Sequence, residues 1–365
     1  MVGKGIKRDF WANKKVLLTG HTGFKGSWLS LWLQNMGARV VGYALSPPTK
    51  PSLFEAAHVA EGMTSISGDV RDFDNLSAVI AKHSPEIVIH MAAQSLVRYS
   101  YRNPLETYTT NVIGTANLLE SVRVARGVKV VIIVTSDKCY ENKEWLWGYR
   151  ENDRIGGHDP YSSSKGCAEL VTAAYRNSFF PIDKFELHGV AVASVRAGNV
   201  IGGGDWADDR LVPDIVRAFQ EGKSVMIRSP QSIRPWQYVL EPIHGYLCLT
   251  ERLYEGRLEF AGPWNFGPNE EGIRTVSWIV DTMAKLWKGG ARWETDSAST
   301  HPHEANLLQL DCSRARNLLL WKPKLSLPLA LEWIVAWYQN YYAGKDMRKL
   351  SDVEIANYER YSDRG

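Results

Sequence analysis

The stretch KKVLLTGHTGFKG, residues 14–26, decides the fold class of this chain. A β-rich apolar run ends at Gly20, and Gly23 and Gly26 follow with the spacing G-x-x-G-x-x-G. The next segment, SWLSLWLQNMG (27–37), has apolar residues at helical spacing. A glycine turn between a strand and a helix lets the backbone approach a pyrophosphate, and the helix N-terminus favours the anion. The stretch therefore predicts a dinucleotide-binding turn, with a tight turn that binds nothing as the alternative.

Short apolar runs and helical patterns alternate through the first half of the chain. Further strands are expected at 38–45, 63–70, 86–93, 128–134 and within 188–202, with helices at 73–84, 109–127 and 162–178, and later helices near 211–221, 275–288 and 326–342. Strands that alternate with helices form right-handed β-α-β units and a parallel sheet covered on both faces. The predicted fold is α/β, with a Rossmann-type doubly wound parallel sheet.

The pattern becomes less regular after Gly202, where loops rich in Gly, Asp and Pro separate the helices. This part predicts a smaller mixed C-terminal substrate domain, packed over the carboxyl edge of the sheet. We expect the dinucleotide-binding domain to span residues 1–198, with 238–262 returning to it. The substrate domain then takes 199–237 and 263–365.

The composition is ordinary for a soluble globular protein, with 44% hydrophobic and 23% charged residues. A net charge of +3 does not indicate nucleic acid or a membrane surface as partner. The four cysteines form no C-x-x-C pair, and His301 with His303 are too few ligands to predict a metal. The N-terminal segment has no apolar signal core, so we expect a cytoplasmic protein.

Polar residues follow the strand expected at 128–134, in the segment VTSDKCYENK (134–143). Ser136, Asp137 and Lys138 place a hydroxyl, an acid and an amine side by side where a buried strand ends. The alternatives are a chemical role and a solvated Asp–Lys pair in a loop.

Tyr161 and Lys165 lie four residues apart in DPYSSSKGCAE (159–169), so on a helix they share one face. A lysine beside a phenol favours the phenolate and lowers its pKa. Tyr161 would then be a general base for a sugar or alcohol hydroxyl near neutral pH. A surface Tyr–Lys pair is the alternative.

Long segments of the chain carry a resemblance to a known family. They are GHTGFKGSWL (20–29), HMAAQSLVRYSYRNP (90–104), TNVIGTANLLE (110–120), TSDKCYEN (135–142), DPYSSSK (159–165), RAGNVIGGGDW (196–206) and IRPWQYVLEPIHGYL (233–247). On these segments the chain resembles the extended short-chain dehydrogenase/reductases that act on nucleotide sugars, and within them the 4,6-dehydratases. The resemblance implies NAD as cofactor and CDP-glucose as the small-molecule substrate.

The resemblance also implies a reaction and a role for each polar residue. Oxidation of C4 makes the C5 proton acidic, water leaves across C5–C6, and the hydride returns to C6. Tyr161, assisted by Lys165, would take the C4 hydroxyl proton, and Ser136 would hydrogen-bond the developing carbonyl. Asp137 would protonate the departing C6 hydroxyl.

Lys138 departs from the pattern of the dehydratases for dTDP-glucose, which carry a Glu as the C5 base at the resembling position. We expect Lys138 to act as that base, since burial or nearby cations can lower the pKa of a lysine. Alternatively, Lys138 positions the substrate or stabilises the enolate while another group takes the proton.

Cofactor contacts are expected at the carboxyl ends of several strands. Asp69 would hold the adenine amino group, with a plain turn as the alternative. The second strand ends in Leu45-Ser46-Pro47 without an acid, so that position does not decide between NAD and NADP. The cofactor-binding candidates are Gly20, Gly23, Phe24, Gly26, Asp69, Val70, Ala92, Ala93, Tyr161 and Lys165.

A diphosphate substrate favours arginine, whose planar fork binds phosphate with two hydrogen bonds. The substrate-binding candidates are Gln94, Arg98, Asn199, Arg210 and Arg234, with surface charge as the alternative for each arginine. Nothing in these residues selects cytosine over another base.

Two other functions use the same fold. A 4-epimerase would need Ser136, Tyr161 and Lys165, but not Asp137. A non-catalytic NAD-sensing protein would need neither Tyr161 nor Lys165. The helices near 109–127 and 160–178 resemble those through which relatives pair, which implies a homodimer or homotetramer. The resemblance also implies a place in the synthesis of deoxysugars for bacterial surface polysaccharide, such as O-antigen.

Overall fold

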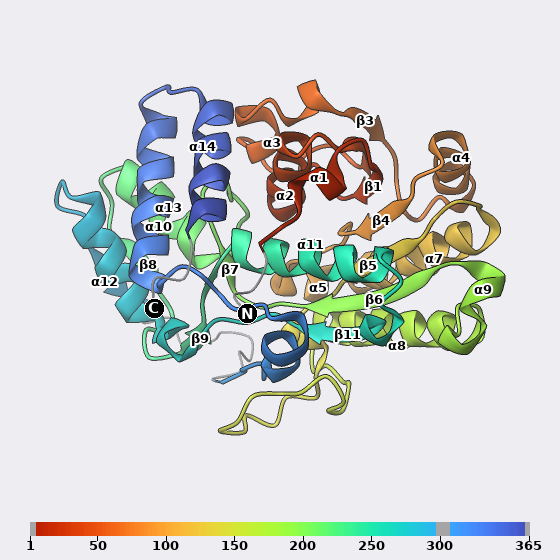
Figure 1. Ribbon diagram of the computed structural model, residues 1–365. Coiled ribbons are helices and arrows are strands. Elements are labelled where there is room, and N and C mark those ends of the chain that lie inside the picture. The colour runs from red at the N-terminus through yellow and green to blue at the C-terminus, as the bar shows by residue number, and fades with distance from the viewer. Residues whose placement is uncertain (1–4, 297–306, 362–365) are drawn as a thin grey trace.

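A seven-stranded parallel sheet forms the centre of the protein in a computed structural model that describes residues 5–296 and 307–361 (Figure 1). The strands lie in the order β11-β6-β5-β4-β1-β2-β3. Their bounds are β1 (Lys15–Thr19), β2 (Arg39–Ala44), β3 (Thr64–Ser67), β4 (Ile87–His90), β5 (Val130–Val134), β6 (Ala191–Arg196) and β11 (Gly262–Asn265). The predicted α/β fold with a doubly wound parallel sheet is confirmed.

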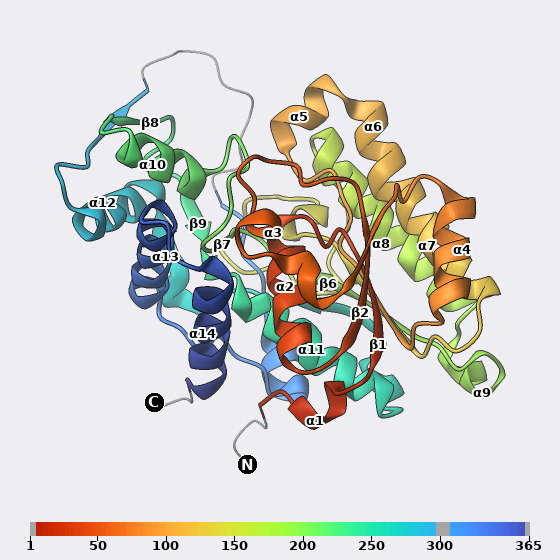
Figure 2. The same cartoon turned by 90° about the horizontal axis from the view of Figure 1, so that it is seen from above.

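Helices cover both faces of the sheet (Figure 2). On one face lie α2 (Phe24–Asn35) and α11 (Leu240–Tyr254), and on the other α4 (Phe73–His83), α7 (Gly114–Val124) and α8 (Pro160–Ser178). Side chains alternate between the faces along a strand. In β5, Val130 and Ile132 therefore pack into one hydrophobic core, and Val131 and Ile133 into the other.

A smaller lobe lies beside the carboxyl edge of the sheet, on the left of Figure 1. It contains α10 (Leu211–Gln220), α12 (Val276–Trp287), α13 (Leu327–Tyr342), α14 (Met347–Arg360) and the paired strands β8 (Val225–Ile227) with β13 (Trp293–Thr295) and β9 (Ile233–Pro235) with β12 (Ile273–Thr275). The pair β7 (Val200–Ile201) and β10 (Gln237–Tyr238) precedes α11. The segment that returns to the sheet ends at Asn265 rather than 262, because β11 pairs with β6.

Short helical segments complete the fold. They are α1 (Arg8–Trp11), α3 (Leu53–Ala56), α5 (Val97–Arg102), α6 (Pro104–Tyr108), α9 (Phe185–His188), the π-helical turns η2 (Thr109–Ile113) and η7 (Ala315–Leu319), and the 3₁₀ turns η1 (Val59–Gly62), η3 (Asp137–Cys139), η4 (Ile182–Lys184), η5 (Leu258–Phe260) and η6 (Glu270–Gly272). Among the residues described, none of the helices combines the length and the apolarity of a membrane span.

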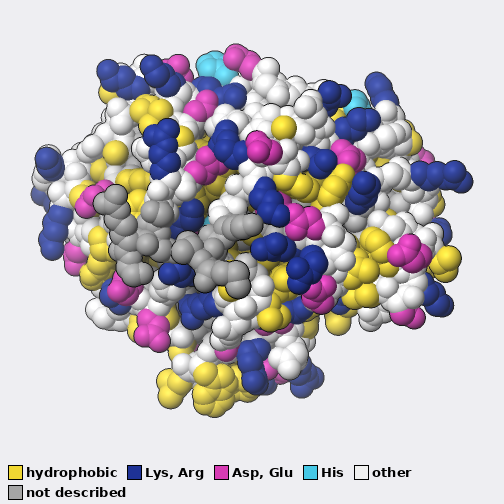
Figure 3. Space-filling view, in the orientation of Figure 1, with side chains coloured by type: hydrophobic (Ala, Val, Ile, Leu, Met, Phe, Trp, Pro, Cys, Tyr) yellow, Lys and Arg dark blue, Asp and Glu magenta, His cyan; other side chains and the backbone are white. Residues whose placement is uncertain are grey.

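One loop after β5 projects from the molecule, at the bottom of Figures 1 and 3. It carries exposed apolar side chains, of which Leu146 is 86% and Trp147 61% exposed. Trp145 stacks on Tyr149 at its base, with ring centroids 5.4 Å apart.

Candidate active site

A cavity of about 1530 Å³ opens at the carboxyl edge of the sheet, where the smaller lobe faces it. Ligands bind at this edge in open α/β sheets. Pockets for one drug-sized ligand measure roughly 300–1,000 Å³, so this cavity has room for two such molecules. Every residue singled out above as a catalytic, cofactor-binding or substrate-binding candidate lines it.

The glycine turn forms one wall of the cavity. Gly20 has a φ of +73°, and an added Cβ would lie 2.7 Å from the Ala92 nitrogen. A Cβ on Gly26 would lie 2.1 Å from the Gly20 oxygen, so the turn and the helix can pack only as glycines. Gly23 is the N-cap of α2, and a Cβ there would meet only the Gly20 oxygen, at 3.4 Å. The open surface of Gly23 and the unpaired N–H groups of α2 together suit a phosphate.

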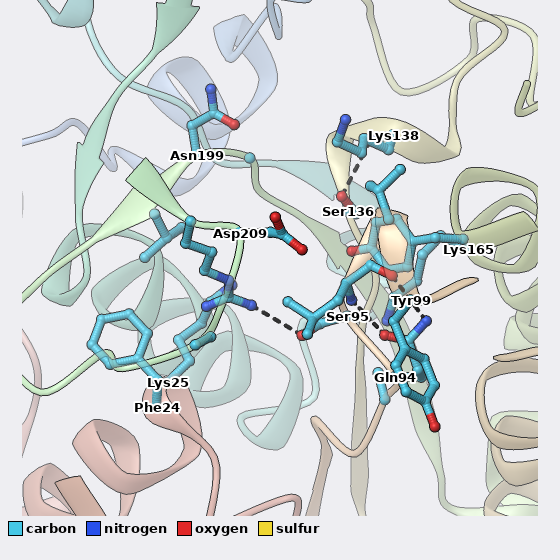
Figure 4. Close-up of a pocket in the computed structure, with 18 of the residues that line it drawn as sticks. Phe24, Lys25, Gln94, Ser95, Tyr99, Ser136, Lys138, Lys165, Asn199 and Asp209 are labelled. Atoms are coloured by element: carbon cyan, nitrogen blue, oxygen red, sulfur yellow. Dashed lines mark hydrogen bonds between the residues drawn. The ribbon is translucent and has the colours of Figure 1, made fainter. Parts of the chain in front are cut away.

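Ser136, Asp137 and Lys138 lie at the end of β5, where Ser136 caps η3. The Ser136 hydroxyl donates to Asp137 Oδ1 at 2.9 Å and accepts from the Lys138 N–H at 3.2 Å. A Cβ added to Gly198 would lie 1.8 Å from Asp137 Oδ2, so glycine at this position leaves room for the carboxylate. Ser136 and Asp137 are buried, whereas Lys138 is half-buried at the cavity (Figure 4).

Tyr161 lies in the first turn of α8, which begins with the N-cap Asp159 and Pro160 at N1. Its N–H donates to Ser100 Oγ at 3.1 Å, which fixes the start of the helix. Burial raises the pKa of Tyr161 to about 12, an effect partly offset by the neighbouring Ser136 hydroxyl, and the Asp137 charge raises the pKa further.

The Lys165 side chain is not placed for the role expected from the sequence. Its Nζ donates to the Val134 carbonyl at 3.3 Å, and burial lowers its pKa to about 8. The prediction that Tyr161 has a lowered pKa is therefore wrong, because burial and the Asp137 charge outweigh the opposing effects of Ser136 and Arg210.

Lys25 was missed by the sequence analysis, although it lies inside the glycine turn. It lines the cavity opposite Ser136 and Lys165 (Figure 4), with its Nζ 5.8 Å from the centroid of the Tyr246 ring. Burial lowers its pKa to about 7, Lys165 and Arg210 lower it further, and Asp137 raises it. Its position, one residue before the third glycine, is the signal in the sequence from which Lys25 could have been identified as a site residue.

Arginines gather on the wall formed by the smaller lobe. Arg210 donates to Asp205 Oδ2 and to Ser95 Oγ, both at 2.9 Å. Arg98 lies 3.3 Å from Asp209, and Arg228, also missed, lies 3.7 Å from the same carboxylate. The arginine forks thus face the cavity already oriented by carboxylates and a hydroxyl.

Three other candidates differ in whether their side chains are held by hydrogen bonds or ion pairs within the protein. Gln94 is bonded to Thr107 Oγ1 at 2.9 Å and to the backbone of Leu96, so it shapes the start of α5. Asn199 adopts a φ of +45° and lies across the cavity from Lys165 (Figure 4). Asp69 forms an ion pair with Arg71 at 2.5 Å.

No group of His, Cys, Asp and Glu side chains in the described ranges is arranged to hold a metal ion. His301 and His303 lie outside those ranges.

The fold and this cavity define an extended short-chain dehydrogenase/reductase. The chain belongs to the GDP-mannose 4,6-dehydratase family, whose model matches residues 17–332. It is 56% identical over 353 residues to a CDP-glucose 4,6-dehydratase of Salmonella typhimurium (strain LT2), a match that covers 97% of this chain and 98% of that protein.

Solved structures share the fold. A UDP-glucuronic acid 4-epimerase from Bacillus cereus, in complex with UDP-glucuronic acid and NAD, has a TM-score of 0.76 at 22% identity, covering 90% of this chain and 100% of its own. A dTDP-glucose 4,6-dehydratase from Bacillus anthracis, in complex with NAD, has a TM-score of 0.72 at 21% identity, covering 90% and 98%.

Proposed function

We propose that the protein converts CDP-D-glucose to CDP-4-dehydro-6-deoxy-D-glucose and water. The observation that carries this proposal is the 56% identity, along 97% of the chain, to a CDP-glucose 4,6-dehydratase. The cavity agrees with it, because Asp137 lies beside Ser136 and Tyr161, and a 4-epimerase does not require this acid.

The cofactor is NAD. Two features of the cavity fit it, namely the open surface of Gly23 and the extension of the cavity past Asp69. When bound, NAD accepts a hydride from C4 of the hexose and later returns it to C6. Gly20, Gly23, Phe24 and Gly26 would hold its pyrophosphate. The adenine side would meet Asp69 and Val70, and the remaining contacts would come from Ala92, Ala93, Tyr161 and Lys165.

The residues at the end of β5 and the start of α8 would carry the proton transfers. Tyr161, in its ionised form, would receive the proton of the C4 hydroxyl, and Ser136 would hold the oxygen that becomes a carbonyl. Lys138 takes the C5 proton, and Asp137 protonates the departing C6 hydroxyl. Among the described residues, no hydrogen bond or ion pair holds the Lys138 amine, so it can turn toward a sugar.

The diphosphate of the substrate would lie against the arginine wall. Arg210 and Arg98 are its main partners, with Arg234, Asn199 and Gln94 lining the same part of the cavity. The two domains expected from the sequence would then hold the two ligands from opposite sides.

Assembly and place in metabolism are part of the same proposal. The outer surfaces of α7 and α8 carry exposed apolar side chains, Val124 and Leu170 among them, which suit pairing of two copies. We expect a homodimer or homotetramer in the cytoplasm that supplies deoxysugars for surface polysaccharide. Light scattering of the purified protein tests the assembly.

The function is tested by incubating the protein separately with CDP-, dTDP-, UDP- and GDP-glucose and following the product masses. Loss of one water from CDP-glucose, with no added reductant, is the expected result. An unchanged mass with an altered sugar configuration would mean a 4-epimerase. Water loss from another nucleotide sugar alone would leave a dehydratase but refute the choice of cytosine.

A further inference from the structure

The guanidinium of Arg228 lines the cavity with its hydrogen-bond donors unused. Arg228 directly follows β8, and its side chain is half-buried. A guanidinium carries five N–H donors in a rigid fork. Among the described residues none accepts a hydrogen bond from this fork, and its Nη1 atom is buried without a partner. Because an unpaired buried donor is unfavourable, this arginine is suited to a ligand that supplies acceptors.

One carboxylate lies beside this guanidinium. Asp209 Oδ1 is 3.7 Å from Arg228 Nη2, and it accepts a hydrogen bond from Arg98 Nη1 at 3.3 Å. The second oxygen, Asp209 Oδ2, has no hydrogen-bond partner in the described ranges. Both residues line the cavity, so its wall presents an open acceptor next to an open fork of donors.

An apolar side chain adjoins this polar pair. Successive side chains of a strand point to opposite sides, and in β8 Val225 and Ile227 are buried in the hydrophobic core. Met226 between them is exposed and lines the cavity, as does Arg228 two residues later. An apolar surface beside polar groups suits a flat ring that has hydrogen-bonding atoms at its edge.

The wall near Arg210 has a different character. The charge of Arg210 lowers the pKa of Lys25, so two cations lie near each other there, as a diphosphate favours. Asp205, the partner of Arg210, is buried, and both of its oxygens accept hydrogen bonds. Asp209 is exposed and has one open oxygen, which repels a phosphate and attracts an N–H donor. The wall near Arg228 therefore suits the base of the nucleotide better than its phosphates.

The edge of cytosine matches a carboxylate next to a guanidinium. Cytosine presents the amino group N4 as a donor, followed by N3 and O2 as two neighbouring acceptors. A guanidinium fork donates to two neighbouring acceptors at once. Uracil and thymine present O4 as an acceptor and N3–H as a donor at the corresponding places. They would therefore turn an acceptor toward the carboxylate and a donor toward the fork.

We propose that Arg228 and Asp209 select cytosine, with the Arg228 fork donating to N3 and O2 and Asp209 Oδ2 accepting from the N4 amino group. The inference rests on the proposed dehydratase function. It adds the residues by which the enzyme distinguishes its nucleotide from those that carry uracil or thymine.

The test is calorimetric titration of the purified protein with CDP and with UDP, which requires no turnover. The wild type should bind CDP more tightly than UDP. Arg228→Lys keeps the charge but removes the fork. Its affinity for CDP should fall about 10–100-fold, the range of a bidentate contact to a base, and its affinity for UDP less than about threefold.

Asp209→Asn tests the second contact. An amide offers either its oxygen or its N–H₂ group, so it can face the N4 amino group of cytosine or O4 of uracil. The ratio of the affinities for CDP and UDP should therefore fall toward one. Asp208→Asn is the matched control, because it removes the same charge from an exposed neighbour in the same loop. It should keep the ratio of the wild type.

Three results would overturn the inference. If Arg228→Lys weakens CDP and UDP by the same factor, the guanidinium binds the part that the two nucleotides share. If the wild type prefers CDP and both variants keep that preference, other groups select cytosine, and the proposed dehydratase function still stands. If the wild type binds CDP and UDP equally, the choice of cytosine in the proposed function fails too.

Discussion

Two buried carboxylates lie near the carboxyl end of β5. Among the described residues, only one of the two has hydrogen-bond partners at both of its oxygens. Glu169 on α8 and Asp137 in η3 are each 4% exposed. Glu169 accepts from Thr135 Oγ1 at 2.5 Å and from Arg196 Nη2 at 2.8 Å, and a second hydroxyl bonds its other side. Asp137 has the hydroxyl of Ser136, but within the described residues no ion pair reaches it.

The difference distinguishes a carboxylate with a structural role from one that we propose to take part in the reaction. Although burial raises the pKa of Glu169, Arg196 and the hydroxyls lower it below the ordinary value, so this carboxylate keeps its charge and ties α8 to the sheet. Asp137 is as deeply buried, yet it faces the cavity with oxygens that are free to exchange a proton. Incomplete hydrogen bonding, not burial, distinguishes the carboxylate that we propose to be reactive.

The largest effect is expected for Asp137→Asn. Turnover of CDP-glucose should fall about 10²–10⁴-fold, because the variant lacks the acid of the elimination. The midpoint of thermal unfolding should change little, because no residue in the described part of the chain forms an ion pair with this carboxylate. Normal turnover, or a large loss of stability, would remove the contrast with Glu169.

Glu169→Gln should have the opposite effect, with its main loss in stability and not in turnover. It leaves the buried Arg196 guanidinium without its counter-charge, which costs about 3–5 kcal/mol of unfolding free energy when a buried pair is broken. Urea unfolding measures this loss. The exposed Glu186→Gln on α9 is the control and should unfold like the wild type.

Acid should weaken the contribution of Glu169. Its pKa is lower in the folded protein than in the unfolded chain, so its stabilisation is present above the unfolded pKa and is lost as pH falls through the folded one. Urea midpoints at decreasing pH should therefore converge for the wild type and Glu169→Gln. A constant gap down to acid pH would mean that the pair does not supply the stability.

Arg210→Lys should raise the KM for CDP-glucose about tenfold and change kcat little, because one bidentate bond to a charged group is lost. Steady-state kinetics give both constants. If kcat falls and KM does not, Arg210 acts near the reacting carbons and not on the diphosphate.

Lys25→Met should have the smallest effect. The affinity for CDP should fall about threefold at pH 7, since one cation near Arg210 is removed. In the wild type the affinity should weaken as pH rises through about 7, where Lys25 loses its proton, and the variant should lack this dependence. Calorimetric titration with CDP at several pH values checks both.

The glycine turn, the parallel sheet and the helix of Tyr161 could be predicted because their patterns are local. Glycine spacing and apolar alternation depend on backbone conformation within a few residues. The hydrogen bond from Lys165 to Val134 and the lowered pKa of Lys25 could not be predicted from the sequence, because they depend on which distant groups share a buried space. Helix α14 was missed for a related reason, since its stability comes from packing on α13 and α2.

The path of one hydrogen tests the central claim most directly. CDP-glucose that carries deuterium at C4 is converted by the purified protein, and the product is examined by nuclear magnetic resonance. Oxidation, elimination and return of the hydride within one cavity predict a 4-keto-6-deoxy product with the deuterium at C6. Deuterium that is retained at C4, or lost to the solvent, would contradict this.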